Sequence, residues 1–182
     1  MVDPESVARQ IVLAALTAAP RSRAELARAM ARKDVPDDVA HAVLDRFTEV
    51  GLIDDAEYAR MFVRSRHADR GLARSALGLE LRRKGIDGAL AARALEELDA
   101  DQEEATARRI ARRRLASTSD LAREVRLRRV VAMLARKGYP PWLAVRIVRD
   151  LLDDERRAGA PGGLANGTDL ADTPDDCYLG DD

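Results

Sequence analysis

The chain is organised around the stretch ALGLELRRKGIDGALAARALEEL, residues 76–98. Two related stretches flank it: ELARAMARKDVPDDVAHAVLDRF at residues 25–47 and RVVAMLARKGYPPWLAVRIVRDL at residues 129–151. When Lys33, Lys84 and Lys137 are aligned, successive stretches lie 51 and 53 residues apart. A repeat of this length is typical of an array of similar structural units.

The apolar residues of the three stretches fall in the same columns. Stretch by stretch they are Leu26, Met30, Val35, Val39, Val43, Leu44 and Phe47; Leu77, Leu81, Ile86, Leu90, Ala94, Leu95 and Leu98; and Val130, Leu134, Tyr139, Leu143, Ile147, Val148 and Leu151. Steps of four, five and eight residues return to one face of a helix. Each stretch therefore predicts two amphipathic helices separated by a turn.

Capping residues mark where helices begin. Ser22 with Glu25, and Asp54 with Glu57, fit capping boxes, in which each side chain accepts a hydrogen bond from the other residue's free backbone amide. The second box predicts a further helix ahead of the 76–98 stretch. Each unit is therefore expected to contain three helices.

Glycines mark where helices end. Gly51, Gly85 and Gly138 each follow a helical stretch, and glycine readily adopts the left-handed conformation that terminates a helix. The predicted helices span residues 4–18, 22–33, 36–49, 55–69, 72–84, 87–98, 101–116, 119–137 and 140–156. No segment alternates with the period of a strand, so the sequence predicts an all-α protein.

The predicted architecture is an elongated, curved array of three tandem three-helix repeats. The repeats span residues 1–53, 54–100 and 101–157, and residues 158–182 form an acidic tail that we expect to be disordered. A unit of about fifty residues buries too little apolar surface to be more than marginally stable alone. Neighbouring units are therefore expected to stack and share apolar faces.

Charge is unevenly distributed along the 182 residues. The tail has six aspartates and no Lys or Arg, and the rest of the chain has 31 basic and 26 acidic residues. The aspartates are Asp169, Asp172, Asp175, Asp176, Asp181 and Asp182. Residues 103–149 alone hold thirteen Lys or Arg against four acidic residues. A basic body predicts an anionic partner, either nucleic acid or an acidic protein surface.

Features of membrane and secreted proteins are missing from the sequence. It lacks an apolar run of about 18 residues and the basic, then apolar, start of a secretory signal. The single cysteine, Cys177, cannot form an internal disulfide, which fits a reducing compartment. We therefore expect a cytoplasmic protein without a membrane partner.

The sequence offers few groups for catalysis. His41 and His67 are isolated, with no second ligand at a metal-binding helical spacing, and Cys177 lies in the tail. The carboxylate pair Asp54 and Asp55 precedes a predicted helix, where capping explains both residues better than acid–base chemistry does. The chain is therefore predicted not to be an enzyme and to bind neither metal nor cofactor.

Two basic runs are candidate binding surfaces. In the helix at 101–116, four arginines gather opposite the apolar side, and Arg114 falls within the apolar side. The four are Arg108, Arg109, Arg112 and Arg113. The second run, in the middle repeat, comprises Arg60, Arg64, Arg66, Arg70, Arg74, Arg82, Arg83 and Lys84. Asp69 and Glu80 can pair with this second run, so a solvated surface is almost as good an explanation there.

Direct DNA binding is the main alternative. A helix-turn-helix unit places its last helix in the major groove, where phosphates repel acidic residues. The third helices at 36–49 and 87–98 are acidic overall, which argues against such a reader. Most of the aromatic residues are expected in the core or at junctions between repeats: Tyr58, Phe62, Tyr139 and Trp142. Trp142 is expected in the core. Stacking of single-stranded nucleic acid on aromatic side chains is therefore disfavoured. Sequence-nonspecific DNA binding and a purely structural helical scaffold remain open.

Residues 51–71, GLIDDAEYARMFVRSRHADRG, with residues 77–87, LGLELRRKGID, resemble the RecX regulatory family, including its RG and EL-x-x-KGI elements. The resemblance covers residues 8–155 and is weakest in the third repeat, where YPPW at 139–142 replaces IDGA. It implies three-helix repeats that bind in the groove of the RecA recombinase filament and inhibit its ATPase, strand-exchange and co-protease activities, without catalysis.

We therefore expect a monomer whose partner is the RecA filament. Contact with DNA through the basic face is a further expectation. The predicted partner-binding residues are Arg64, Arg70, Arg74, Arg82, Arg83, Lys84, Arg108, Arg109, Arg112 and Arg113.

Overall fold

Helices make up the fold of the computed structural model, which describes residues 3–159. They are α1 (Pro4–Ala18), α2 (Arg23–Ala31), α3 (Asp37–Glu49), α4 (Asp55–Arg70), α5 (Arg74–Arg83), α6 (Gly88–Glu96), α7 (Ala100–Ala116), α8 (Arg123–Arg136) and α9 (Pro141–Gly159). No strand occurs in this range, so the all-α prediction is confirmed. The predicted tail lies outside the described residues, apart from its first two.

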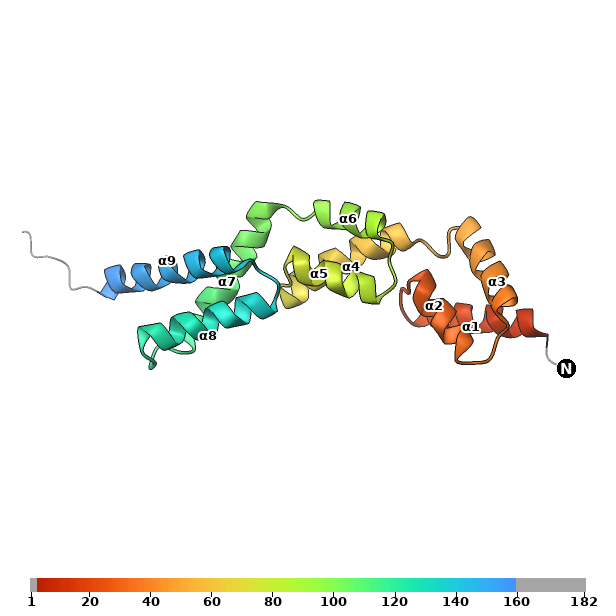
Figure 1. Ribbon diagram of the computed structural model, residues 1–182, viewed down its shortest axis with the longest axis horizontal. Helices are drawn as coiled ribbons and strands as arrows, with labels where there is room; N and C mark the ends of the chain where they lie inside the picture. The colour runs from red at the N-terminus through yellow and green to blue at the C-terminus, as the bar shows by residue number, and fades with distance from the viewer. Residues whose placement is uncertain (1–2, 160–182) are drawn as a thin grey trace, which may run out of the picture.

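The helices pack in consecutive threes (Figure 1). We name these block one (α1–α3), block two (α4–α6) and block three (α7–α9). The blocks follow one another along the long axis of the molecule, so the predicted elongated array of three-helix repeats is confirmed. The largest boundary difference is at α8, predicted from residue 119. Residues 117–121 instead form turns, where the buried Thr118 hydroxyl donates to the carbonyl of Arg114.

The predicted helix ends are largely present. Ser22 and Glu25 form the reciprocal capping box. Asp54 accepts a hydrogen bond from the Glu57 amide, but the Glu57 carboxylate binds Arg60 instead of completing the second predicted box. Gly51, Gly85 and Gly138 have φ of 74°, 77° and 90°. Asp34, in the same repeat column as Gly85 and Gly138, also has a positive φ, of 55°. The alignment on the three lysines therefore matches backbone conformation as well as apolar spacing.

Each block has its own apolar core. Three separate clusters of buried side chains correspond to the three blocks, and Ala73 is the one buried residue of the described chain that joins a neighbouring block's cluster. The expectation that neighbouring units share apolar faces therefore holds only at Ala73, and the described cores are otherwise separate. The cores close within each block because α3, α6 and α9 each cover the other two helices of their block.

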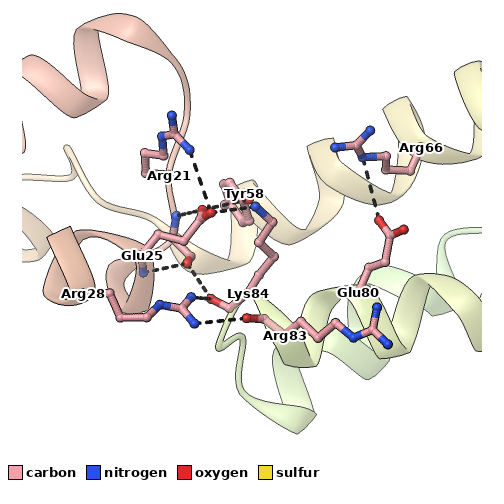
Figure 2. Close-up of polar contacts among 9 residues, drawn as sticks. Arg21, Glu25, Arg28, Tyr58, Arg66, Glu80, Arg83 and Lys84 are labelled. Carbon is pink, nitrogen blue, oxygen red and sulfur yellow. Dashed lines mark hydrogen bonds and ion pairs between the residues drawn. The ribbon is translucent and has the colours of Figure 1, made fainter.

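Polar contacts join block one to block two (Figure 2). The Ser22 hydroxyl donates to the Lys84 carbonyl at 2.7 Å, and the Arg23 amide donates to the Asp55 carboxylate at 2.8 Å. Glu25 accepts hydrogen bonds from the Lys84 amine at 2.6 Å and the Tyr58 hydroxyl at 3.1 Å. The N-terminus of α2 thus docks on the C-terminal turn of α5.

The junction between blocks two and three repeats this arrangement. The Ala73 amide donates to the Lys137 carbonyl at 2.8 Å, and the Ser75 hydroxyl donates to the Gly138 carbonyl at 2.7 Å. The Arg74 amide donates to the Glu103 carboxylate at 2.8 Å, in the role that Arg23 and Asp55 have at the first junction. Both junctions therefore use the N-terminus of one middle helix and the C-terminal turn of the next.

Candidate functional site

Block three presents a basic surface built by α7 and α8. Ala107, Ala111 and Leu115 are fully buried at four-residue steps, so α7 turns one face toward the core. Arg109 and Arg113 occupy the other side of the helix and are exposed. In α8, Val130 and Leu134 provide the equivalent buried positions. The flanking arginines of both helices are therefore left at the surface.

Two adjoining hollows form this surface. The first, of about 370 Å3, is lined by Arg109, Arg113 and Arg114 of α7, together with Arg70 and Lys137. The second, of about 420 Å3, is lined by Arg114 and by three arginines of α8. Because Arg114 lines both hollows, they form one continuous surface. We call it the cationic surface and define it by Arg109, Arg113, Arg114, Arg128, Arg129 and Arg136.

The six arginines of the cationic surface carry uncompensated charge. All six are exposed, and none forms an ion pair with another residue of the 3–159 range. Asp69 is the one acidic residue that lines either hollow. Like charges within a Debye length of about 8 Å repel one another at physiological salt, so an anion that binds here relieves that repulsion. Guanidinium groups suit carboxylates and phosphates alike.

The structure separates the four predicted arginines of α7. Arg109 and Arg113 belong to the cationic surface, whereas Arg108 contacts Glu104 at 3.4 Å and Asp150 of α9 at 3.8 Å. Arg112 is exposed and lines neither hollow. Two of the four are therefore brought together with α8, and two are not.

The predicted arginines of α4 and α5 pair with nearby carboxylates. Arg64 contacts Glu57 at 3.2 Å and Glu97 at 3.8 Å. Arg70 contacts Glu80 at 3.7 Å and also lines the first hollow of the cationic surface. These residues do not form one free surface.

Their neighbours behave in the same way. Arg60 hydrogen-bonds Glu57, which lowers the pKa of the Glu57 carboxyl below its usual value. Arg66 contacts Glu80 at 3.9 Å (Figure 2), and Arg74 contacts Glu103 at 3.5 Å across the second junction. Neighbouring carboxylates therefore neutralise much of the charge of the second basic run.

A third hollow lies at the first junction. It has a volume of about 510 Å3, and its basic lining residues are Arg21, Arg28, Arg32, Arg83 and Lys84. Arg28 donates to the carbonyls of Arg83 and Lys84, and Lys84 binds Glu25 (Figure 2). Several of these groups therefore hold the two blocks together. Arg82 is exposed on α5 and lines none of the three hollows.

Hydrogen bonding fixes the ionisation of Glu25. Burial raises the pKa of its carboxyl, but hydrogen bonds from Lys84, the Ser22 amide and Tyr58, with the charge of Lys84, lower the pKa below its usual value. Burial, with the charge and hydrogen bond of Glu25, raises the pKa of the Tyr58 hydroxyl to about 12. Glu25 is therefore held as a carboxylate and Tyr58 as a neutral donor.

Four residues of the cationic surface were not among the predicted site residues. The helical spacing places Arg114 within the apolar side of α7, but the buried face is centred on Ala111 and Leu115, which leaves Arg114 at its edge. Arg136 shares a repeat column with Arg32 and Arg83, and this signal could have found it. For Arg128 and Arg129, the one sequence feature that pointed to a binding surface was the high density of basic residues in 103–149.

The aromatic predictions hold for three residues and are wrong for one. Tyr58, Phe62 and Tyr139 are buried. Trp142 is 65% exposed in the first turn of α9, with Arg146 stacked 5.3 Å from the ring centre. Its repeat column contains Asp38 and Ala89, which are also exposed, because Leu143 and Ile147 occupy the buried face.

The histidines make hydrogen bonds within the fold. His41 lies 2.6 Å from the Asp37 carbonyl, and His67 bridges the Leu72 carbonyl and the Thr106 hydroxyl. Within residues 3–159, no three His, Cys, Asp or Glu side chains are grouped to hold a metal ion. Cys177 lies outside that range. None of the helices that the structure describes combines the length and apolar character of a membrane span.

Comparison with known proteins agrees with this architecture. Residues 8–47, 54–95 and 101–148 match, in order, the first, second and third three-helix domains of RecX. Regulatory protein RecX of Thermobifida fusca is 54% identical over 148 residues, which cover 81% of this chain and 80% of that protein. Regulatory protein RecX of Streptomyces coelicolor is 50% identical over 153 residues, which cover 84% and 81%.

A solved structure shares the fold. The crystal structure of RecX from Lactobacillus salivarius superposes with a TM-score of 0.74 at 21% identity, covering 83% of this chain and 98% of that one. The three domain matches and the two relatives confirm the resemblance carried by residues 51–71 and 77–87. The chain belongs to the RecX family, whose members are regulatory proteins rather than enzymes.

Proposed function

We propose that this chain binds the filament of a RecA recombinase in the cytoplasm, as a monomer, and inhibits its ATPase, strand-exchange and co-protease activities. Membership of the RecX family supports the choice of partner. The observation that carries the proposal is the cationic surface, six exposed arginines without ion pairs among the described residues. Such a surface fits an acidic partner.

The extended array explains why a filament is the target. Three blocks in line present basic hollows at both the first junction and block three. A molecule of this shape contacts neighbouring subunits of a polymer at once, and linked contacts gain affinity from their high effective concentration. A single free subunit offers fewer of these contacts. The chain therefore binds the assembled filament in preference to the free recombinase.

Occlusion is the mechanism that this geometry favours. A rod that lies in the filament groove and bridges subunits blocks entry of a second DNA molecule, which strand exchange requires. It also opposes the subunit rearrangements that accompany ATP hydrolysis. No bond is made or broken by the chain itself.

Direct, sequence-nonspecific DNA binding is the second candidate. The cationic surface supports it, because arginine binds phosphate as well as carboxylate. Against it, α3 exposes Asp37, Asp38, Asp45 and Glu49, and α6 ends in exposed Glu96. These helices occupy the position of a recognition helix in a helix-turn-helix unit, where phosphates would repel them.

Two titrations at one salt concentration separate the candidates. The chain is added to preformed recombinase filaments on single-stranded DNA, and ATP hydrolysis is followed. Binding to the same DNA without recombinase is measured in parallel. A filament regulator inhibits hydrolysis at concentrations well below those that saturate naked DNA. A DNA binder inhibits only as it saturates the DNA, and its log affinity falls by about 0.7–0.9 per phosphate contact per log unit of salt.

A further inference from the structure

We infer that residues 160–182, the acidic segment of this chain, bind its own cationic surface and compete there with anionic partners. The segment carries six aspartates and no Lys or Arg. It lies outside the residues that the structure describes, so the inference rests on its sequence, its point of attachment and the surface that it would cover. The effect on partners rests on the proposed function; the internal contact does not.

Charge complementarity is the first argument. The cationic surface offers six guanidinium groups that no carboxylate of the 3–159 range neutralises. The acidic segment brings the same number of carboxylates without any competing cation. Arginine and carboxylate groups form paired hydrogen bonds of matching geometry. Other basic groups of the chain, such as Lys84 and Arg108, already have carboxylate partners.

The point of attachment is the second argument. The acidic segment follows α9, which packs against both α7 and α8. Arg123 contacts Asp153 at 2.7 Å and Arg126 contacts Glu155 at 2.8 Å, so the end of α9 lies beside the beginning of α8. Arg128 and Arg129 follow on the next turn of α8. The segment therefore leaves the folded part of the chain close to the beginning of α8, the helix that carries three of the six arginines.

Chain length is the third argument. Asp169, the first of the six aspartates, is ten residues beyond Gly159, a reach of about 33 Å when extended. The 19 residues of α9 span about 28 Å. The acidic segment can therefore double back along the whole of block three. Because it is tethered, its effective concentration at the surface is of the order of millimolar, so weak ion pairing is sufficient.

The consequence is a threshold for binding. An anionic partner must displace the acidic segment before it occupies the cationic surface. A ligand with many spaced anionic groups displaces the segment, whereas an isolated anion does not. The segment thus favours an extended polyanionic surface over weak, scattered anions.

Fluorescence energy transfer tests the contact in the full chain, without any partner. Trp142 is the one tryptophan and Cys177 the one cysteine of the 182 residues, so an acceptor dye on Cys177 forms a unique pair with Trp142. Docking brings residue 177 back toward the start of α9. Transfer is expected to be high at low salt and to fall near 1 M salt, where the Debye length is about 3 Å.

Two matched variants test whether the energy transfer depends on the charge of the acidic segment. In the first, Asp175→Asn, Asp176→Asn and Asp181→Asn neutralise half of the acidic segment. In the second, Asp38→Asn, Glu49→Gln and Glu96→Gln remove the same charge from exposed positions of α3 and α6. Only the first variant is expected to lose transfer. Equal transfer in the wild type and the first variant, or transfer insensitive to salt, would overturn the inference.

A binding assay tests the competition. The probe is a fluorescent single-stranded thymidine oligonucleotide, read by anisotropy at one salt concentration. The first variant is expected to bind it about tenfold more tightly than the second, as when an effective concentration near 1 mM competes against a dissociation constant near 0.1 mM. Equal affinities would contradict competition. The filament is absent from both assays, so their failure leaves the proposed function standing, and failure of the ATPase titration leaves the internal contact standing.

Discussion

The side-chain amine of Lys84 lies 2.6 Å from the carboxylate of Glu25, and this ion pair joins block two to block one. The same carboxylate accepts hydrogen bonds from Tyr58 and from the Ser22 amide. The apolar clusters of the two blocks are separate. Glu25 is therefore a partly buried carboxylate that gathers several of the polar contacts at the first junction, and the stability of the junction should depend in part on its charge.

Replacing Glu25→Gln should destabilise the chain by about 2 kcal/mol, the range of a hydrogen bond to a charged group. The amide keeps the shape of the side chain but removes its attraction for Lys84. Urea unfolding followed by circular dichroism measures the change. The control is Glu5→Gln, which breaks the pair with Arg9 between side chains that are half exposed. It should cost less than about 1 kcal/mol. Equal costs would contradict a central role for Glu25.

The effect of Glu25→Gln should depend on pH. The pKa of Glu25 is lower in the folded chain than the usual 4.5. Its carboxylate therefore stabilises the fold above about pH 4.5, and this contribution is lost as the pH falls through the folded-state pKa. Burial raises the pKa of Asp55 at the same junction, so the effect of Asp55 on stability changes with pH in the opposite direction. The difference in free energy of unfolding between the wild type and Glu25→Gln isolates the contribution of Glu25, and it should shrink below about pH 4.5. A difference that stays constant from about pH 7 to about pH 3 would refute the stabilising role of the Glu25 carboxylate.

Gly138→Ala should be more damaging than Gly51→Ala. Both glycines have a positive φ, so alanine is strained by about 1–2 kcal/mol at either position. At Gly138 the new Cβ would also lie 2.7 Å from the backbone nitrogen of Ala76, whereas at Gly51 it meets nothing within 4 Å. Close contact with a neighbouring block should add about 1–3 kcal/mol. Thermal unfolding compares the two variants, and equal melting temperatures would argue against tight docking at the second junction.

Trp142 should report solvent exposure in the native protein. Its side chain is 65% exposed, so its emission should be red-shifted and readily quenched by acrylamide before unfolding. Trp142→Ala should change the free energy of unfolding by no more than about 1 kcal/mol, the range of its contact with Arg146. Blue-shifted emission protected from quencher would show that Trp142 is buried.

Periodicity was sufficient to predict the helices and the core. The column of Leu26, Leu77 and Val130 is fully buried, and so is the column of Met30, Leu81 and Leu134. Glycine placement likewise predicted the left-handed turns at Gly85 and Gly138. These features depend on residues within one or two helical turns, where spacing along the chain corresponds to position in space.

The junctions and the cationic surface depend on long-range contacts and could not be read in this way. Arg108 and Arg109 are adjacent, yet Arg108 contacts Glu104 and, across the block, Asp150 of α9, whereas Arg109 forms an ion pair with neither. The pairing of Arg23 with Asp55 joins residues 32 positions apart. The exposure of Trp142 was available from its repeat column, but its aromatic character suggested a core position.

The most direct test is a charge reversal on the cationic surface, Arg109→Glu with Arg113→Glu, in the filament ATPase titration. Neither residue has an ion partner in the described part of the chain, so the fold should be retained, which circular dichroism checks. The control is Arg46→Glu with Arg93→Glu, an equal change of charge at exposed positions of α3 and α6. The account predicts that the first variant needs at least about ten times more protein for half-inhibition, a loss of about 1.4 kcal/mol, while the control stays close to wild type. Equal inhibition by both folded variants would contradict it.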